Sequence, residues 1–156
     1  MIIKVDSREQ LPLPWKVEGN VKSVLTVGLP FGDYWCAFQD RDGKELNEMP
    51  IVFERKGVED LLSTMTSGNE RFQRELERAN KVDCKLYVIV EGTLSDVIKA
   101  EGSRQVKPGQ IIKTIFTFKV KYGLETIFCD GRQEMMRYMI ETWEAFGRNF
   151  GPKLVH

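Results

Sequence analysis

The segment from Ile51 to Asp60, which reads IVFERKGVED, constrains this chain more than any other stretch. It begins as an apolar run and then turns charged, which is the pattern of a buried strand whose end meets solvent. Because side chains alternate along a strand, Glu54 and Lys56 share one face and Arg55 lies on the other. A carboxylate beside an ammonium at a strand end suits metal-dependent hydrolysis of a phosphodiester. On its own this motif is weak evidence, because a solvated surface salt bridge has the same sequence.

The composition is that of an ordinary globular chain. Its 156 residues, 42% of them apolar, predict a single domain over residues 1–156 with a substantial core. The 23 basic and 23 acidic residues cancel, so any surface for nucleic acid must be local. The amino end shows no signal peptide and the longest apolar run, Leu86–Val90, is too short to cross a membrane, so we expect a cytoplasmic protein. We expect free, buried thiols at Cys36, Cys84 and Cys129.

The histidine content excludes several kinds of catalysis. His156 is the only histidine, which argues against Ser-His-Asp and Cys-His mechanisms and against a zinc site with histidine ligands. Carboxylates, lysines and arginines remain, together with a hard cation. Because the available ligands are oxygen atoms, Mg²⁺ or Mn²⁺ is the expected metal.

Apolar patterns predict strands and helices that alternate in the second half. The expected strands are Ile2–Asp6, Val21–Val27, Phe31–Phe38, Ile51–Arg55, Lys85–Val90 and Leu124–Cys129. The expected helices are one from Val58, Glu70–Lys81 with a capping box at Ser67, Leu94–Lys99, Gln110–Tyr122 and one from Asp130 to about Phe146. Two segments are interpreted as loops, the polar hairpin Gln39–Pro50 and the basic segment Glu101–Gly109. This order predicts an α/β fold with a mixed central sheet and helices on both faces.

The predicted hairpin brings a second carboxylate to the strand that carries Glu54. The strand that opens with Gly32-Asp33-Tyr34 should pair antiparallel with it across the polar loop. Asp33 can then lie close to Glu54, so that both carboxylates face one cation. The loop is too long for the register of this pairing to follow from the sequence.

With these residues placed, the chain resembles the nuclease domain of the XPF family of structure-specific DNA endonucleases. That family belongs to the restriction-endonuclease-like PD-(D/E)xK group, and the resemblance extends to about Phe146. Its motifs occur here in order, as VDxRE at Val5–Glu9, GD at Gly32-Asp33, ERKxxxD at Glu54–Asp60 and an arginine-aromatic pair at Arg71-Phe72. Nothing in the sequence resembles the helix-hairpin-helix module or the helicase-like region of larger family members.

The resemblance implies a restriction-endonuclease-like fold with an active site that uses Mg²⁺ or Mn²⁺. Asp33 and Glu54 resemble the metal-binding carboxylates of the family, with Asp6 as a further ligand. Lys56 resembles the residue that orients or deprotonates the attacking water. The supporting residues of the family correspond to Arg8, Glu9, Arg55 and Asp60.

DNA contacts are expected from basic residues outside that cluster. Arg71 resembles a phosphate-contacting position of the family, and its alternative role is to pair with glutamates on an exposed helix face. Arg104 and Lys107 lie in the basic loop, which we also assign to DNA. A polar loop without DNA contact is the alternative for these two residues.

The function implied by the resemblance is a DNA endonuclease that acts on branched, flap or junction DNA. Family nuclease domains pair with a related domain, so a homodimer or a related nuclease partner is expected. The last helix is the expected interface, with Met135 and Tyr138 exposed on it. Two alternatives stay open: a non-catalytic DNA-binding or scaffold subunit that pairs with an active nuclease, and a nuclease directed to its target by another chain.

Overall fold

The computed structural model describes residues 1–40 and 42–150, so His156 lies outside the described residues. Within these ranges seven strands form one sheet in the order β2-β1-β3-β5-β6-β7, with β4 paired to β3. The strands are β1 (Ile2–Asp6), β2 (Ser23–Val27), β3 (Tyr34–Gln39), β4 (Glu45–Glu48), β5 (Ile51–Gly57), β6 (Lys85–Glu91) and β7 (Glu125–Cys129). The helices are α1 (Val58–Met65), α2 (Asn69–Lys81), α3 (Leu94–Gly102), α4 (Gln110–Tyr122) and α5 (Arg132–Phe150).

The sheet is mixed, as the sequence predicts. Strands β5, β6 and β7 run parallel, and β1 runs parallel to β2. Strand β3 is antiparallel to both β1 and β5, which confirms the predicted pairing of the GDY and ERK strands. The register that the sequence left open places Tyr34 opposite Phe53. This register sets Asp33 and Glu54, the neighbours of that pair, at the same end of the hairpin.

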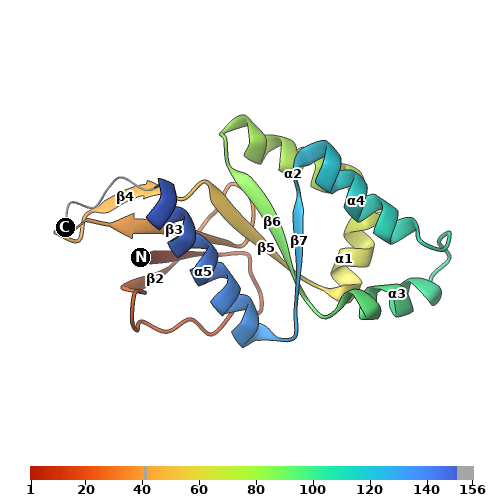
Figure 1. Cartoon of the computed structure of the whole chain (residues 1–156), viewed down its shortest axis with the longest axis horizontal. Helices are drawn as coiled ribbons and strands as arrows, with labels where there is room; N and C mark the ends of the chain where they lie inside the picture. Colours follow the sequence, from red (N-terminus) through yellow and green to blue (C-terminus); the bar gives the residue numbers. More distant parts are fainter. Residues whose placement is uncertain (41, 151–156) are drawn as a thin grey trace.

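Helices cover both faces of the sheet, and the alternation along β5 shows why. Val52 packs in a core with α1, α2 and α4, whereas its neighbour Phe53 packs in a second core with α5. Figure 1 shows α5 lying apart from the other four helices. Trp143 of α5 is fully buried, and its indole N–H donates to the carbonyl of Ile51 at 3.0 Å. Strands that are buried on both sides explain the continuous apolar runs in the sequence.

The prediction of a polar loop over Gln39–Pro50 is wrong for five of its residues: Gln39 ends β3, and Glu45–Glu48 form β4. This strand is short, polar and mostly exposed, so hydrophobic alternation did not reveal it. Lys4 of β1 forms ion pairs with Glu45 at 2.6 Å and Glu48 at 2.7 Å. Strand β4 is stabilised by its pairing with β3 and by these ion pairs with Lys4 of β1. Neither contact can be inferred from the local sequence pattern.

Two predicted helix caps are also wrong. Helix α2 begins at Asn69 after Gly68, with no side-chain cap bond, so Ser67 does not form the expected capping box. Helix α5 begins at Arg132, and Asp130 lies one residue too early to cap it. In each case a glycine stands between the predicted cap and the helix. Backbone geometry therefore moved the helix start past a good capping residue.

The last helix presents a different face from the one expected. Met135 is fully buried against the sheet, which contradicts its predicted exposure, whereas Tyr138 is 41% exposed as expected. By contrast, α4 has the predicted bounds, and Gly123 ends it with φ of 68°. The three cysteines are buried and free, as predicted. Among the described residues, no helix is long and apolar enough to span a membrane.

Candidate active site

A polar cavity of about 530 Å³ opens where the β3–β5 hairpin meets α1, α2 and the segment after β1. Eight of the residues predicted from the sequence line it together: Arg8, Glu9, Asp33, Glu54, Arg55, Lys56, Asp60 and Arg71. They come from five separate parts of the chain. The structure therefore gathers the predicted active-site residues around one cavity.

Asp33 is fixed against β5 by backbone hydrogen bonds. Its N–H donates to the carbonyl of Phe53 at 2.8 Å, and its Oδ2 accepts the N–H of Arg55 at 2.8 Å. Burial and, after it, the negative charge of Glu54 raise the pKa of the Asp33 carboxyl to about 8. The carboxylate is therefore held in one orientation but needs a positive partner to be charged at neutral pH.

Glu54 and Lys56 form a close pair on one face of β5, as the alternation predicts. Lys56 Nζ donates to Glu54 Oε1 at 2.9 Å, and both side chains are more than four-fifths buried. Burial raises the pKa of Glu54, and the charge of Lys56 opposes this shift. The ammonium also lies 5.5 Å from the ring centroid of Phe72. A solvated surface salt bridge does not describe this pair.

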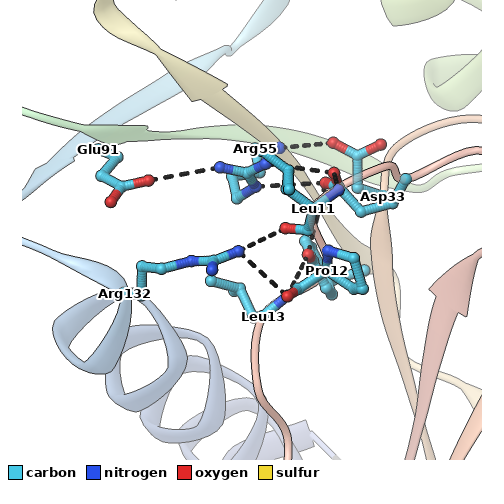
Figure 2. A network of polar contacts seen from close by, with 9 residues as sticks. Leu11, Pro12, Leu13, Asp33, Arg55, Glu91 and Arg132 are labelled. Carbon is cyan, nitrogen blue, oxygen red and sulfur yellow. Dashed lines mark hydrogen bonds and ion pairs between the residues drawn. The ribbon is translucent and has the colours of Figure 1, made fainter.

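Arg55 points to the opposite side of the strand and joins three segments of the chain. Its Nε and Nη2 donate to the two carboxylate oxygens of Glu9, each at 3.2 Å, and its Nη1 lies 3.4 Å from Glu91 at the end of β6. Figure 2 shows Arg55 reaching between Asp33 and Glu91. Burial acts to raise the pKa of Glu9, but the hydrogen bonds from Arg55 and from the N–H of Leu11, together with the charge of Arg55, leave that pKa lowered. Arg55 thus holds the end of β5 in place.

Asp6 is engaged by its own neighbours rather than aimed at the cavity. Its side chain accepts the N–H and Nε of Arg8 at 2.7 and 2.8 Å, the Nη2 of Arg8 at 2.6 Å and the N–H of Leu29 at 3.1 Å. The hydrogen bonds from Arg8 lower the pKa of this buried carboxyl. Within residues 1–40 and 42–150 no three His, Cys, Asp or Glu side chains form a group that could hold a metal. Asp6 is not among the residues that line the cavity, although its N–H donates to the carbonyl of Asp33 at 2.8 Å.

The basic residues assigned to DNA lie in different places. Arg71, at the start of α2, is exposed and lines the cavity beside the carboxylates. Arg104 instead forms an ion pair with Glu59 of α1, and Lys107 is exposed in the segment before α4. Neither Arg104 nor Lys107 is among the residues that line the cavity. Only Arg71 is thus placed next to the site.

Sequence reasoning missed Glu75 of α2, which lines the same cavity. Its Oε1 accepts the N–H of Gly32 at 3.1 Å, so it helps to hold the turn that carries Asp33. Its charge adds to burial in raising the pKa of Glu54. The helical spacing of four residues from Arg71 to Glu75 was a signal that could have placed both on the cavity side.

The donor set suits a hard divalent cation. Mg²⁺ binds through one or two carboxylates and completes its shell with water and substrate phosphates. Asp33 and Glu54 supply two such carboxylates, and Oδ1 of Asp33 and Oε2 of Glu54 take no part in the bonds described above. Their mutual repulsion and burial, seen in the raised pKa of Asp33, would be offset by a bound cation.

The fold is an α/β domain with a mixed sheet, and a polar cavity lined by carboxylates opens at the β3–β5 hairpin. Residues 5–141 match the ERCC4 domain family, and the chain belongs to that family. It is similar to the solved structure "XPF from Aeropyrum pernix, complex with DNA", with 20% identity and a TM-score of 0.66 over 94% of this chain and 65% of that one. It is also similar to "XPF from Aeropyrum pernix", with 19% identity and a TM-score of 0.66 over 92% of this chain and 65% of that one.

The comparisons identify a fold more firmly than an activity. The chain spans 65% of the length of the two XPF structures, and at this level of identity the likeness shows the shared fold. No curated protein matches the sequence.

Proposed function

We propose that this chain is a Mg²⁺- or Mn²⁺-dependent endodeoxyribonuclease that hydrolyses phosphodiester bonds in branched, flap or junction DNA, with residues 1–156 as one nuclease domain. The observation that carries the proposal is the pair of partly buried carboxylates, Asp33 and Glu54, beside the ammonium of Lys56 in one polar cavity. Membership of the ERCC4 domain family supports it. The complex of a structural relative with DNA supports the nucleic acid as substrate.

In this proposal Asp33 and Glu54 hold the cation. A bound divalent cation supplies positive charge for the phosphate and lowers the pKa of its water. The ammonium of Lys56 donates one N–H to Glu54 and has two further N–H groups, which suits it to orient the attacking water or a phosphate oxygen. Arg71, exposed at the cavity, offers a planar fork that matches a phosphate.

The remaining predicted residues act through others. Arg55 and Glu9 fix the end of β5 through their paired hydrogen bonds, and so set the position of Glu54 and Lys56. Asp6 and Arg8 close the turn after β1, where Arg8 Nη2 also donates to the carbonyl of Leu29 at 2.8 Å. We therefore propose Asp6 as a positioning residue.

The proposal is tested by cleavage of labelled DNA. The purified chain is incubated with duplex, single-stranded, flap and four-way-junction DNA, each with Mg²⁺, Mn²⁺ or EDTA. We expect cleavage with either metal and none in EDTA or with Asp33→Asn. Asp83→Asn, which changes an exposed aspartate after α2, is the matched control and should cut normally. If Asp33→Asn cuts at the normal rate, the site is misplaced.

The second candidate is a non-catalytic subunit that binds DNA and pairs with an active nuclease. The observation that favours it is the ion pair of Lys56 with Glu54 at 2.9 Å, which gives the Glu54 carboxylate a positive partner without a metal. Calorimetric titration with Mn²⁺ separates the two candidates. The nuclease should bind Mn²⁺ and lose this binding in Asp33→Asn, whereas a non-catalytic subunit has no need of a metal at Asp33. We also propose that the chain forms a homodimer or pairs with a related nuclease, which sedimentation velocity would reveal.

A further inference from the structure

Leu11 is an apolar side chain in an unusual place, since it lies 67% exposed at the rim of a cavity that is otherwise polar. The same cavity contains Asp33 and Glu54. Isolated exposed leucines are common on protein surfaces and need no explanation. What sets Leu11 apart is how firmly its backbone is held.

Both backbone groups of Leu11 are hydrogen-bonded. Its N–H donates to Glu9 Oε1 at 3.0 Å, and its carbonyl accepts from Nη2 of Arg132 at the start of α5. The same nitrogen also donates to the carbonyl of Pro12 at 3.1 Å, as Figure 2 shows. Two residues on, the N–H of Leu13 donates to the Tyr34 hydroxyl at 2.9 Å. The segment is therefore held in place, and Leu11 is presented outward by a fixed backbone.

This segment is also tied to the strand that carries the site. Glu9 accepts from the backbone of Leu11 and, through both of its carboxylate oxygens, from the guanidinium of Arg55. The backbone N–H of Arg55 in turn donates to Asp33. One chain of hydrogen bonds therefore fixes the distance from Leu11 to the carboxylates.

We propose that Leu11 is a specificity-determining wedge that packs against an unstacked base next to the phosphodiester being cut. This inference rests on the proposed nuclease function. Proteins insert leucine and similar apolar side chains between base steps, and the insertion costs least where bases are already unpaired. A phosphate bound near Asp33 and Lys56 places its own nucleotides at the rim of the cavity, where Leu11 stands. Leu11 thus favours DNA with a branch or a frayed end over regular duplex.

The first test measures unstacking without cleavage. A flap duplex carries the fluorescent base 2-aminopurine in the first base pair beside the branch, and it is bound by the Asp33→Asn protein. We expect fluorescence to rise on binding, and the rise to be lost when Leu11→Ala is added. Val17→Ala is the matched control, because Val17 is 65% exposed on the same connection and does not line the cavity. It should leave the rise unchanged.

The second test measures cleavage by the otherwise unaltered protein. We expect Leu11→Ala to slow cutting of the flap duplex about tenfold, the effect of losing one good contact with a base, and to change cutting of single-stranded DNA by less than about twofold. Leu11→Phe should keep the preference for the flap. Equal slowing on both substrates, or none on either, would overturn the wedge while leaving the nuclease in place. A wild type that cuts nothing overturns the proposed function, and the fluorescence test still decides the wedge.

Discussion

The backbone N–H of Arg55 donates to Oδ2 of Asp33 at 2.8 Å, so the strand that carries Glu54 also holds the second carboxylate of the site. The neutral donor fixes the orientation of Asp33 but does little to offset its charge. Burial and the charge of Glu54 still raise its pKa to about 8. Ionisation of both carboxylates is therefore unfavourable in the metal-free site, and a bound cation would offset this cost.

Metal binding should release a proton below pH 8. Asp33 is protonated there in the metal-free protein, because its pKa is raised to about 8, and a ligating carboxylate must be deprotonated. The affinity for Mn²⁺ should thus rise with pH and level off above about 8. Calorimetry at pH 7 in two buffers of different ionisation enthalpy measures the released proton. Equal binding enthalpies in both buffers would contradict the assigned titration.

The stability of the metal-free protein should fall as pH rises from about 4 to about 8. Asp33 has an ordinary carboxyl pKa of 3.8 when unfolded and about 8 when folded, so the folded state binds more protons in this range. Asp33→Asn removes this term and should stabilise the protein at pH 8 by on the order of 2 kcal/mol, with little effect at pH 4. Urea unfolding in EDTA at both pH values measures the difference. The prediction fails if the variant is the less stable protein at pH 8.

The two partners of Arg55 should differ in importance. The Arg55 and Glu9 side chains are only 14% and 8% exposed, and Arg55→Met leaves the Glu9 carboxylate buried without its cation. We expect a loss of about 3 kcal/mol in the free energy of unfolding, together with a loss of cleavage. Glu91→Gln is the control, because Glu91 is 39% exposed and 3.4 Å away, and it should cost less than about 1 kcal/mol. Comparable losses in urea unfolding would show that Glu9 is not the main partner.

The sequence predicts the site best where one strand or one hairpin decides the outcome. Glu54 and Lys56 share a face because strands alternate, and Asp33 joins them because a hairpin pairs its strands antiparallel. The hydrogen-bond partners of Asp6 could not all be predicted from one strand or one hairpin. The N–H of Leu29 that it accepts lies 23 residues along the chain, on a segment that only β1–β2 pairing brings close.

Other features that the sequence did not indicate depend on contacts between distant segments. Arg104 forms an ion pair with Glu59, 45 residues earlier, and only the packing of α3 and α4 against α1 brings the two together. Strand β4 was not predicted because it pairs with the backbone of β3 and with the charge of Lys4 on β1 rather than with an apolar face. Local patterns state what a segment can form, whereas tertiary packing decides which charges meet.

The glycine before Asp33 should tolerate no side chain. Gly32 has φ of 69°, and a Cβ there would lie 2.6 Å from Cγ2 of Val52. Gly32→Ala should therefore destabilise the protein by roughly 2–4 kcal/mol and weaken Mn²⁺ binding, because Val52 or the turn that presents Asp33 must move. Gly28→Ala is the matched control, since a Cβ there meets nothing within 4 Å, and it should change the free energy of unfolding by no more than about 0.5 kcal/mol. Urea unfolding and Mn²⁺ titration of both variants check this, and a Gly32→Ala protein that behaves like Gly28→Ala would show that the turn is free to rearrange.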